Sequence, residues 1–258
     1  MFFNARKNGY DAGDGPVRYL DGSSLTRPLE APRPQMLAMA AFVLAAAVIG
    51  GVFLFNVIDN VTHSAERTRA TVEQNLARPA SMASLPNLAS LAGLDAEGVK
   101  TAFAESGWSI ADKGALSGDE SGNLDLIKLP DDVSEAQALL MYSNVSSLFA
   151  ADATLLLNGS WQFTSEAGGS VNMRVKYADF SSGSVEAAVQ TAIASEGFDP
   201  ATAGEMAVDE SGNTFQEGTV AAGDATYHWR VSAIKLSSVY DIKGLPDTAV
   251  YVGIRLYA

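Results

Sequence analysis

The chain has 258 residues, of which 17 are lysine or arginine and 30 are aspartate or glutamate, so its formal charge at pH 7 is −13. Such an acidic chain lacks the cationic surface that phosphate backbones require, which argues against a nucleic-acid partner. It contains no cysteine, which excludes disulfides, thiol catalysis and thiolate metal sites. The length allows one or two domains with a sizeable core.

Residues 1–35 hold four of the nine prolines and few large apolar side chains. A segment of this composition cannot bury enough apolar surface to fold, so we expect a disordered cytoplasmic tail. The tail is too short to form an output domain, and any signal passing through it would need a second protein.

An uncharged apolar stretch of 23 residues runs from Met36 to Ile58, with Asn56 as its one strongly polar side chain. A helix of this length rises roughly 35 Å, enough to cross about 30 Å of hydrocarbon. We therefore expect a single transmembrane helix at 36–58, with a cleaved signal peptide as the alternative. Small residues spaced four apart within 46–51 would permit weak self-association of such helices.

The orientation of the span follows from its flanking charges. Two arginines lie within 15 residues on either side, so the positive-inside rule gives a tie. Arg33 lies closest before the span and Asp59 follows it directly, which favours a cytoplasmic N-terminus. The residues after the span include 12 lysines and arginines and 26 aspartates and glutamates. We expect a single-pass protein of the cell membrane whose acidic C-terminal region is extracytoplasmic.

Residues 59–93 are expected to form a juxtamembrane helix and a linker. Between Asp59 and Arg78 there is no glycine or proline, and apolar side chains recur at helical intervals. After Arg78, Pro79 and Pro86 together with several serines interrupt this period.

An internal repeat organises the remainder of the chain. Residues 99–123 align with residues 189–213 at a constant offset of 90, with 12 identities in 25 positions, where chance gives about two. Both copies end in the run Asp-Glu-Ser-Gly-Asn. We interpret the pattern as a tandem duplication, with one α+β repeat at 94–180 and a second at 181–258.

Each repeat is expected to begin with an amphipathic helix. In the first copy Asp95 caps the helix, Gly107 ends it and Trp108 turns back onto the core. In the second copy the same roles fall to Ser184, Gly197 and Phe198.

The two Asp-Glu-Ser-Gly-Asn runs are rich in turn-forming residues, and we expect each to join two strands. Oxygen-bearing side chains at alternate positions from Asp119 to Asp125 are also typical of some calcium loops. The distal glutamate of an EF-hand is missing, and Phe215 stands where the first copy has Asp125. A turn is therefore the leading interpretation, with a cation site as the alternative.

The first copy is longer than the second. Aligning Ala153-Thr154 with Ala225-Thr226 leaves 18 extra residues, at about 131–148, which predict an inserted helix capped by Asp132. Strands are expected at 155–157 and 161–163. They would be joined by a tight hairpin at Asn158-Gly159, or would form one longer strand with a bulge there.

Three strands alternate apolar and polar side chains, at 171–178, 226–233 and 250–257, which predicts an α+β fold with an antiparallel sheet packed on one side. Their other faces carry the candidate ligand or partner residues, Arg174, Lys176, His228, Arg230, Tyr251, Arg255 and Tyr257. If these strands are neighbours, the residues form a basic surface edged by aromatic rings, suited to an anionic envelope polymer or an acidic partner protein. The alternative is a set of solvated ion pairs.

Signatures of catalysis and of cofactor binding are missing from the sequence. With only His63 and His228, one chain cannot form a histidine metal cluster, and no nucleophile elbow or phosphate-cradling loop occurs. We expect a non-enzymatic, membrane-anchored binding or assembly protein of a bacterial envelope, without a cofactor. A sensor or regulatory subunit acting through a partner protein is the first alternative, and a carboxylate-based envelope hydrolase is the second.

Overall fold

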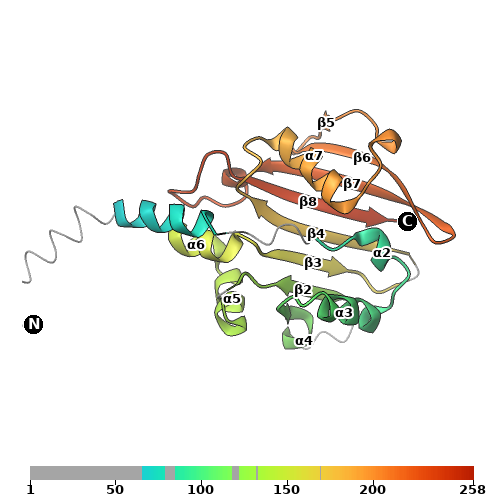
Figure 1. Cartoon of the computed structure of the whole chain (residues 1–258), viewed down its shortest axis with the longest axis horizontal. Helices are drawn as coiled ribbons and strands as arrows, with labels where there is room; N and C mark the ends of the chain where they lie inside the picture. The colour runs from blue at the N-terminus through green and yellow to red at the C-terminus, as the bar shows by residue number, and fades with distance from the viewer. Residues whose placement is uncertain (1–65, 79–84, 118–121, 132, 169) are drawn as a thin grey trace, which may run out of the picture. The chain divides into compact units, whose positions relative to one another are not determined.

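The structure is a computed structural model that describes residues 66–78, 85–117, 122–131, 133–168 and 170–258 (Figure 1). These residues all belong to one unit, Val61–Ala258. The predicted tail and transmembrane helix lie outside the described residues. Among the helices that are described, none has the length and apolar character needed to span a bilayer.

The described chain forms one eight-stranded sheet in the order β1-β2-β3-β4-β8-β7-β6-β5, and every neighbouring pair is antiparallel. The strands are β1 Ile110–Asp112, β2 Leu124–Lys128, β3 Trp161–Ser165, β4 Asn172–Asp179, β5 Ala207–Val208, β6 Thr214–Ala222, β7 Ala225–Lys235 and β8 Val250–Tyr257. The predicted α+β fold with an antiparallel sheet is confirmed, including the three alternating strands, which are β4, β7 and β8.

The helices are α2 Leu88–Leu91, α3 Ala96–Glu105, α4 Lys113–Ser117, α5 Glu135–Tyr142, α6 Ala150–Leu157 and α7 Val185–Glu196, with 3-10 turns η2 Val145–Ser147, η3 Pro200–Thr202 and η4 Leu236–Ser238. A further helical segment spans 66–76. The predicted caps of the two long helices are present, because the Asp95 side chain accepts a hydrogen bond from the Gly98 amide and Ser184 accepts one from Ala187. Gly197 ends α7 with φ 71°, a left-handed conformation that favours glycine.

From the centre of the sheet outward, the strands follow in reverse chain order on both sides: β4, β3, β2, β1 on one side and β8, β7, β6, β5 on the other. β4 pairs with β8 in the middle, with Val175 opposite Ile254. Lys128 of β2 pairs with Trp161, and Gly218 of β6, ninety positions later, pairs with Trp229. Trp161 and Trp229 therefore hold corresponding positions in the two halves.

One face of the sheet packs against α2, α3 and α7 and forms the main core (Figure 1). In the first half Phe103 of α3 contacts the rings of Trp108, Trp161 and Phe163 at centroid distances of 5.2 to 5.5 Å. In the second half Phe198 stacks on Trp229 at 4.9 Å. Phe198 is buried as expected, whereas Trp108 is only partly buried. These rings supply much of the apolar surface that holds the helices on the sheet.

The insertion of the first half differs from its prediction. Residues 155–157 belong to helix α6 rather than to a strand, so the expected alignment of Ala153 with Ala225 is wrong. Alanine and leucine dominate α6, and both are strong helix formers. Helix α5 starts at Glu135 with Ser134 as its cap, so the predicted cap at Asp132, itself outside the described residues, is also wrong.

The second face of the sheet is covered at one end only. There α5, α6 and residues of the 66–76 helix form a second apolar cluster with Ile127, Ala178 and Leu236. The Asn75 side chain donates to the carbonyl oxygen of Ala151 at 2.8 Å, which ties the 66–76 helix to α6. The rest of this face carries polar and charged side chains.

Two shorter segments also differ from expectation. The predicted linker contains α2, whose Leu88 is fully buried. The Glu196 carboxylate at the end of α7 accepts a hydrogen bond from the Leu88 amide at 2.7 Å.

The second Asp-Glu-Ser-Gly-Asn run joins β5 to β6 as a turn, as predicted. In the first copy the described residues on either side are helix α4 and strand β2, not two strands.

Candidate functional site

Three arginines form a row across the central strands, on the face opposite α3 and α7. Arg174 of β4 lies directly opposite Arg255 of β8, and Arg255 lies opposite Arg230 of β7. Adjacent strands are about 5 Å apart, so the row spans roughly 10 Å. Like charges placed directly opposite each other destabilise a sheet, so this arrangement calls for compensating groups.

A hollow of about 330 Å³ opens beside the arginine row. Its floor includes Gly253, which pairs with Lys176 on one side and Ser232 on the other. Because Gly253 has no side chain, the long side chains around it leave space above the strand. The hollow is lined by Arg174, Val175, Lys176, Asp209, Arg230, Ser232, Gly253, Ile254 and Arg255.

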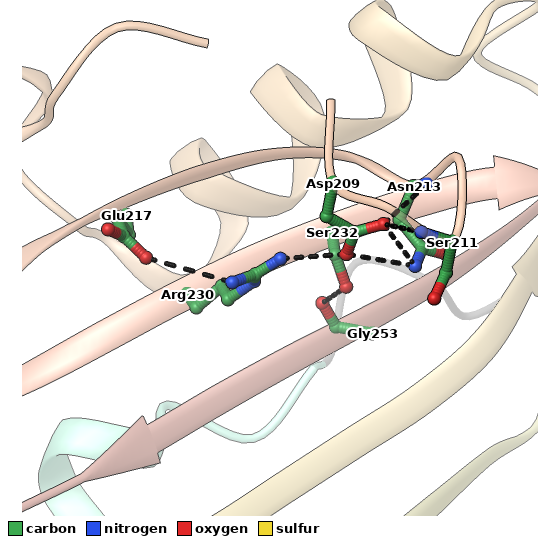
Figure 2. A network of polar contacts seen from close by, with 7 residues as sticks. All are labelled: Asp209, Ser211, Asn213, Glu217, Arg230, Ser232 and Gly253. Atoms are coloured by element: carbon green, nitrogen blue, oxygen red, sulfur yellow. Dashed lines mark hydrogen bonds and ion pairs between the residues drawn. The ribbon is translucent and has the colours of Figure 1, made fainter. Parts of the chain in front are cut away.

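Arg230 takes part in a network of polar and acidic groups (Figure 2) and also contacts an aromatic ring. Its terminal nitrogens lie 2.8 Å from Asp209 Oδ2 and 3.9 Å from Glu217 Oε2, and its guanidinium lies 3.7 Å from the centre of the Phe215 ring. Hydrogen bonds from Asn213 and the positive charge of Arg230 hold the pKa of Asp209 below its usual range. Arg230 is thus neutralised by carboxylates.

Arg174 and Arg255 share a second network at the other side of the hollow. The Arg255 Nε atom donates to Asn172 Oδ1 at 3.0 Å, and Asn172 Nδ2 donates to Glu166 at 2.5 Å. Arg174 lies 3.7 Å from the same glutamate. The guanidinium of Arg255 also lies 4.7 Å from the centre of the Tyr257 ring. Its orientation is therefore fixed by a neutral amide and an aromatic ring.

Arg255 and Lys176 are the two cations of the hollow that contact no carboxylate among the described residues. Lys176 is exposed on β4. It lies opposite Gly253, two positions along β8 from Arg255, a diagonal separation that long side chains can bridge. Two cations that no described carboxylate compensates thus line one hollow of a strongly acidic protein.

Six of the seven predicted residues share this open face. His228 stacks on Tyr257 at 5.6 Å, next to the arginine row. Tyr251 lies on the same side of the sheet but at its covered end, packed edge-on against Tyr240 at 5.8 Å. Burial raises the pKa of Tyr251 above its usual range. Tyr251 therefore does not line the hollow.

Sequence reasoning did not select Asp209, Ser232 or Gly253 as site residues. Gly253 carries a usable signal, because a glycine on the polar face of an otherwise regular strand marks a place where something approaches the backbone. The sequence predicts a turn at Asp209, and the contact of this residue with Arg230 depends on the folded position of that turn.

The described residues contain no group of three or more histidine, aspartate or glutamate side chains placed to hold a metal ion. In the second turn the Asp209 carboxylate is bonded to Asn213 and to Arg230 instead. The arrangement of the hollow suits the binding of an anion by hydrogen bonds and charge. Comparison of the chain with protein-family models, curated proteins and solved structures found no match.

Proposed function

We propose that the protein is a non-enzymatic, membrane-anchored binding protein that holds an anionic ligand in the hollow above Gly253, on the extracytoplasmic side of a bacterial cell membrane. The observation that carries the proposal is the pair of cations, Arg255 and Lys176, that line the hollow and have no carboxylate partner within the part of the chain that the structure describes. The anchor rests on the apolar stretch 36–58.

Charge balance supports binding at this position. Arg255 lies between two other arginines on the neighbouring strands, so its charge is opposed from both sides. An anion in the hollow relieves this repulsion and forms charge-assisted hydrogen bonds with the terminal nitrogens of Arg255.

We further propose that the two halves of the sheet derive from the tandem duplication suggested by the repeat. The identical strand order about the central β4–β8 pair and the correspondence of Trp161 with Trp229 support it. On this view Lys176 and Arg255 hold corresponding positions, because each follows one of the central paired residues Val175 and Ile254. The ligand would then lie between the two halves.

The ion pairs around the hollow decide which substitutions can test anion binding without also lowering stability. Reversing the charge of Arg230 would bring a carboxylate against Asp209 and Glu217, so a loss of binding would be confounded with a loss of stability. Replacing Arg255 and Lys176 by glutamine removes no ion pair among the described residues. The double variant K176Q/R255Q is therefore the sharper test.

Isothermal titration of the full-length protein with polyphosphate and with polyglutamate, at constant ionic strength, tests the proposal. We expect at least one of these polyanions to bind the wild type and to lose binding at least tenfold in K176Q/R255Q. The control K235Q/K243Q makes the same charge change at two lysines outside the hollow and should bind as the wild type does. Equal binding by both variants, or no binding by the wild type, would contradict the proposal.

A further inference from the structure

Building on the proposed anion site, we infer that its ligand is a phosphate monoester in its dianionic form, bound by Arg255 and Lys176, rather than a carboxylate. The first step is the charge of the hollow. Arg230 is compensated by Asp209 and Glu217, and Arg174 is compensated by Glu166, although more loosely. Two positive charges remain, and a ligand carrying two negative charges neutralises them.

The second step is the direction of the donors. The Nε atom of Arg255 is occupied by Asn172, so the two terminal nitrogens present the fork that grips two oxygens of one anion. Lys176 lies on the neighbouring strand, in the row of paired residues next to the arginine row, and also lines the hollow. A phosphate group offers three acceptor oxygens in a tetrahedral arrangement. A planar carboxylate that engages the fork has no third oxygen for Lys176.

The third step concerns the remainder of the ligand. Six of the nine residues that line the hollow have charged or polar side chains, and Val175 and Ile254 point their own side chains into the core on the opposite face. Such walls bind an ester head and offer little surface for an acyl chain. The phosphate is therefore expected on a soluble or polymer-borne ester rather than on a lipid.

The ligand's own titration supplies the test. A phosphate monoester gains its second negative charge with a pKa of about 6, so its dianion falls from nearly complete at pH 7.5 to roughly a tenth at pH 5. A site selective for the dianion binds glycerol phosphate about tenfold more weakly at pH 5 than at pH 7.5. A carboxylate ligand is ionised over almost all of this range, and its binding would stay nearly constant.

Protein groups near the hollow that can change charge include Glu166, Asp209, Glu217 and His228. Any gain of positive charge at His228 would strengthen anion binding, which is the reverse of the expected trend. Carrying out the titrations in H228Q as well as in the wild type separates the two effects. The pH dependence due to the ligand should be the same or steeper in H228Q.

The experiment is isothermal titration of the full-length protein with glycerol phosphate and with acetate, at pH 5, 6 and 7.5 and constant ionic strength. We expect glycerol phosphate to bind with the tenfold pH dependence, acetate to bind at least tenfold more weakly at pH 7.5, and K176Q/R255Q to bind neither. Acetate binding as tightly as glycerol phosphate, without pH dependence, would overturn the phosphate assignment and leave the anion site standing. Failure of every anion tested would overturn the proposed function itself.

A lipid source of the phosphate is tested separately with phosphatidylcholine vesicles that contain phosphatidic acid. Vesicles of phosphatidylcholine alone measure the association caused by the apolar stretch 36–58, and we expect soluble glycerol phosphate to displace any additional binding that phosphatidic acid causes. Binding that occurs only to the vesicles and resists soluble ester would overturn the assignment to a soluble or polymer-borne ester.

Discussion

Replacing Glu196 by glutamine should change how the stability of the fold depends on pH. Glu196 lies at the end of α7 with only 2% of its surface exposed. One carboxylate oxygen accepts the Leu88 amide, and the other has no hydrogen-bond partner among the described residues. Burial raises the pKa of this carboxyl from 4.5 to about 8, partly offset by the Leu88 hydrogen bond.

The magnitude follows from proton linkage. Because the folded pKa is raised, the contribution of Glu196 to the free energy of unfolding is most favourable below pH 4.5 and is lost as the pH rises towards 8. At about 1.4 kcal/mol per pH unit, the loss reaches roughly 4 to 5 kcal/mol across this window. Burial raises the pKa of Tyr177 of β4 above its usual range, and the nearby charges of Asp179 and Glu196 add to this rise.

Glutamine keeps an acceptor for the Leu88 amide but introduces a buried amide group without a partner, which costs about 1 to 3 kcal/mol. E196Q should therefore be less stable than the wild type by about 1 kcal/mol at pH 5 and more stable by about 2 kcal/mol at pH 8. Urea unfolding followed by tryptophan fluorescence from pH 5 to 8.5 measures both curves.

The matched control is Glu186→Gln, an exposed glutamate in the first turn of the same helix. The E186Q curve should stay parallel to that of the wild type throughout. Parallel curves for E196Q and the wild type, with no crossing between pH 5 and 8, would refute the reasoning about burial of Glu196.

Three further substitutions test other parts of the account. Asn172→Asp replaces the hydrogen bond to Glu166 with a repulsion between two carboxylates, so some loss of stability is expected. In the folded variant the new carboxylate should pair with Arg255 and weaken anion binding severalfold in a titration; unchanged affinity would count against the charge argument. Gly218→Ala should destabilise by about 1 to 3 kcal/mol in urea unfolding, because the added Cβ would lie 2.6 Å from the Trp229 ring; a neutral result would show that the ring can move. Burial tends to raise the pKa of Asp179, but hydrogen bonds from Ser182 and Ser181 lower it overall. Asp179→Asn should therefore remove stability that the wild type has above pH 4 and loses on acidification. If the free energy of unfolding of the variant fell on acidification as much as that of the wild type, this reasoning would be contradicted.

Much of the fold could be predicted because the sequence patterns that indicate its strands and helix starts are local. Period-two alternation identified β4, β7 and β8, and cap residues placed the starts of α3 and α7. The error at 155–157 arose because a short apolar run fits a strand or a buried helix equally well. The alanines and leucines of α6 favour the helix, and tertiary contacts such as that between Asn75 and Ala151 hold it in place.

The sequence predicted which face of the sheet carries the candidate site, but not how the residues of the site are arranged on that face. Alternation assigns a residue to one side of a strand, which was sufficient to select Arg174, Lys176, Arg230 and Arg255. The register between strands decides which of these are opposite one another, and the ion pairs with Glu166 and Asp209 decide which charges remain uncompensated. Both depend on long-range contacts that no local pattern in the sequence encodes.

The central claim is that Arg255 and Lys176 hold an anion above Gly253. A crystal structure of the protein grown or soaked with glycerol phosphate tests this most directly. The account predicts phosphate oxygens within hydrogen-bonding distance of the terminal nitrogens of Arg255 and of the Lys176 amine, with the Arg230 to Asp209 contact retained. Phosphate bound elsewhere, with only water in the hollow, would contradict it.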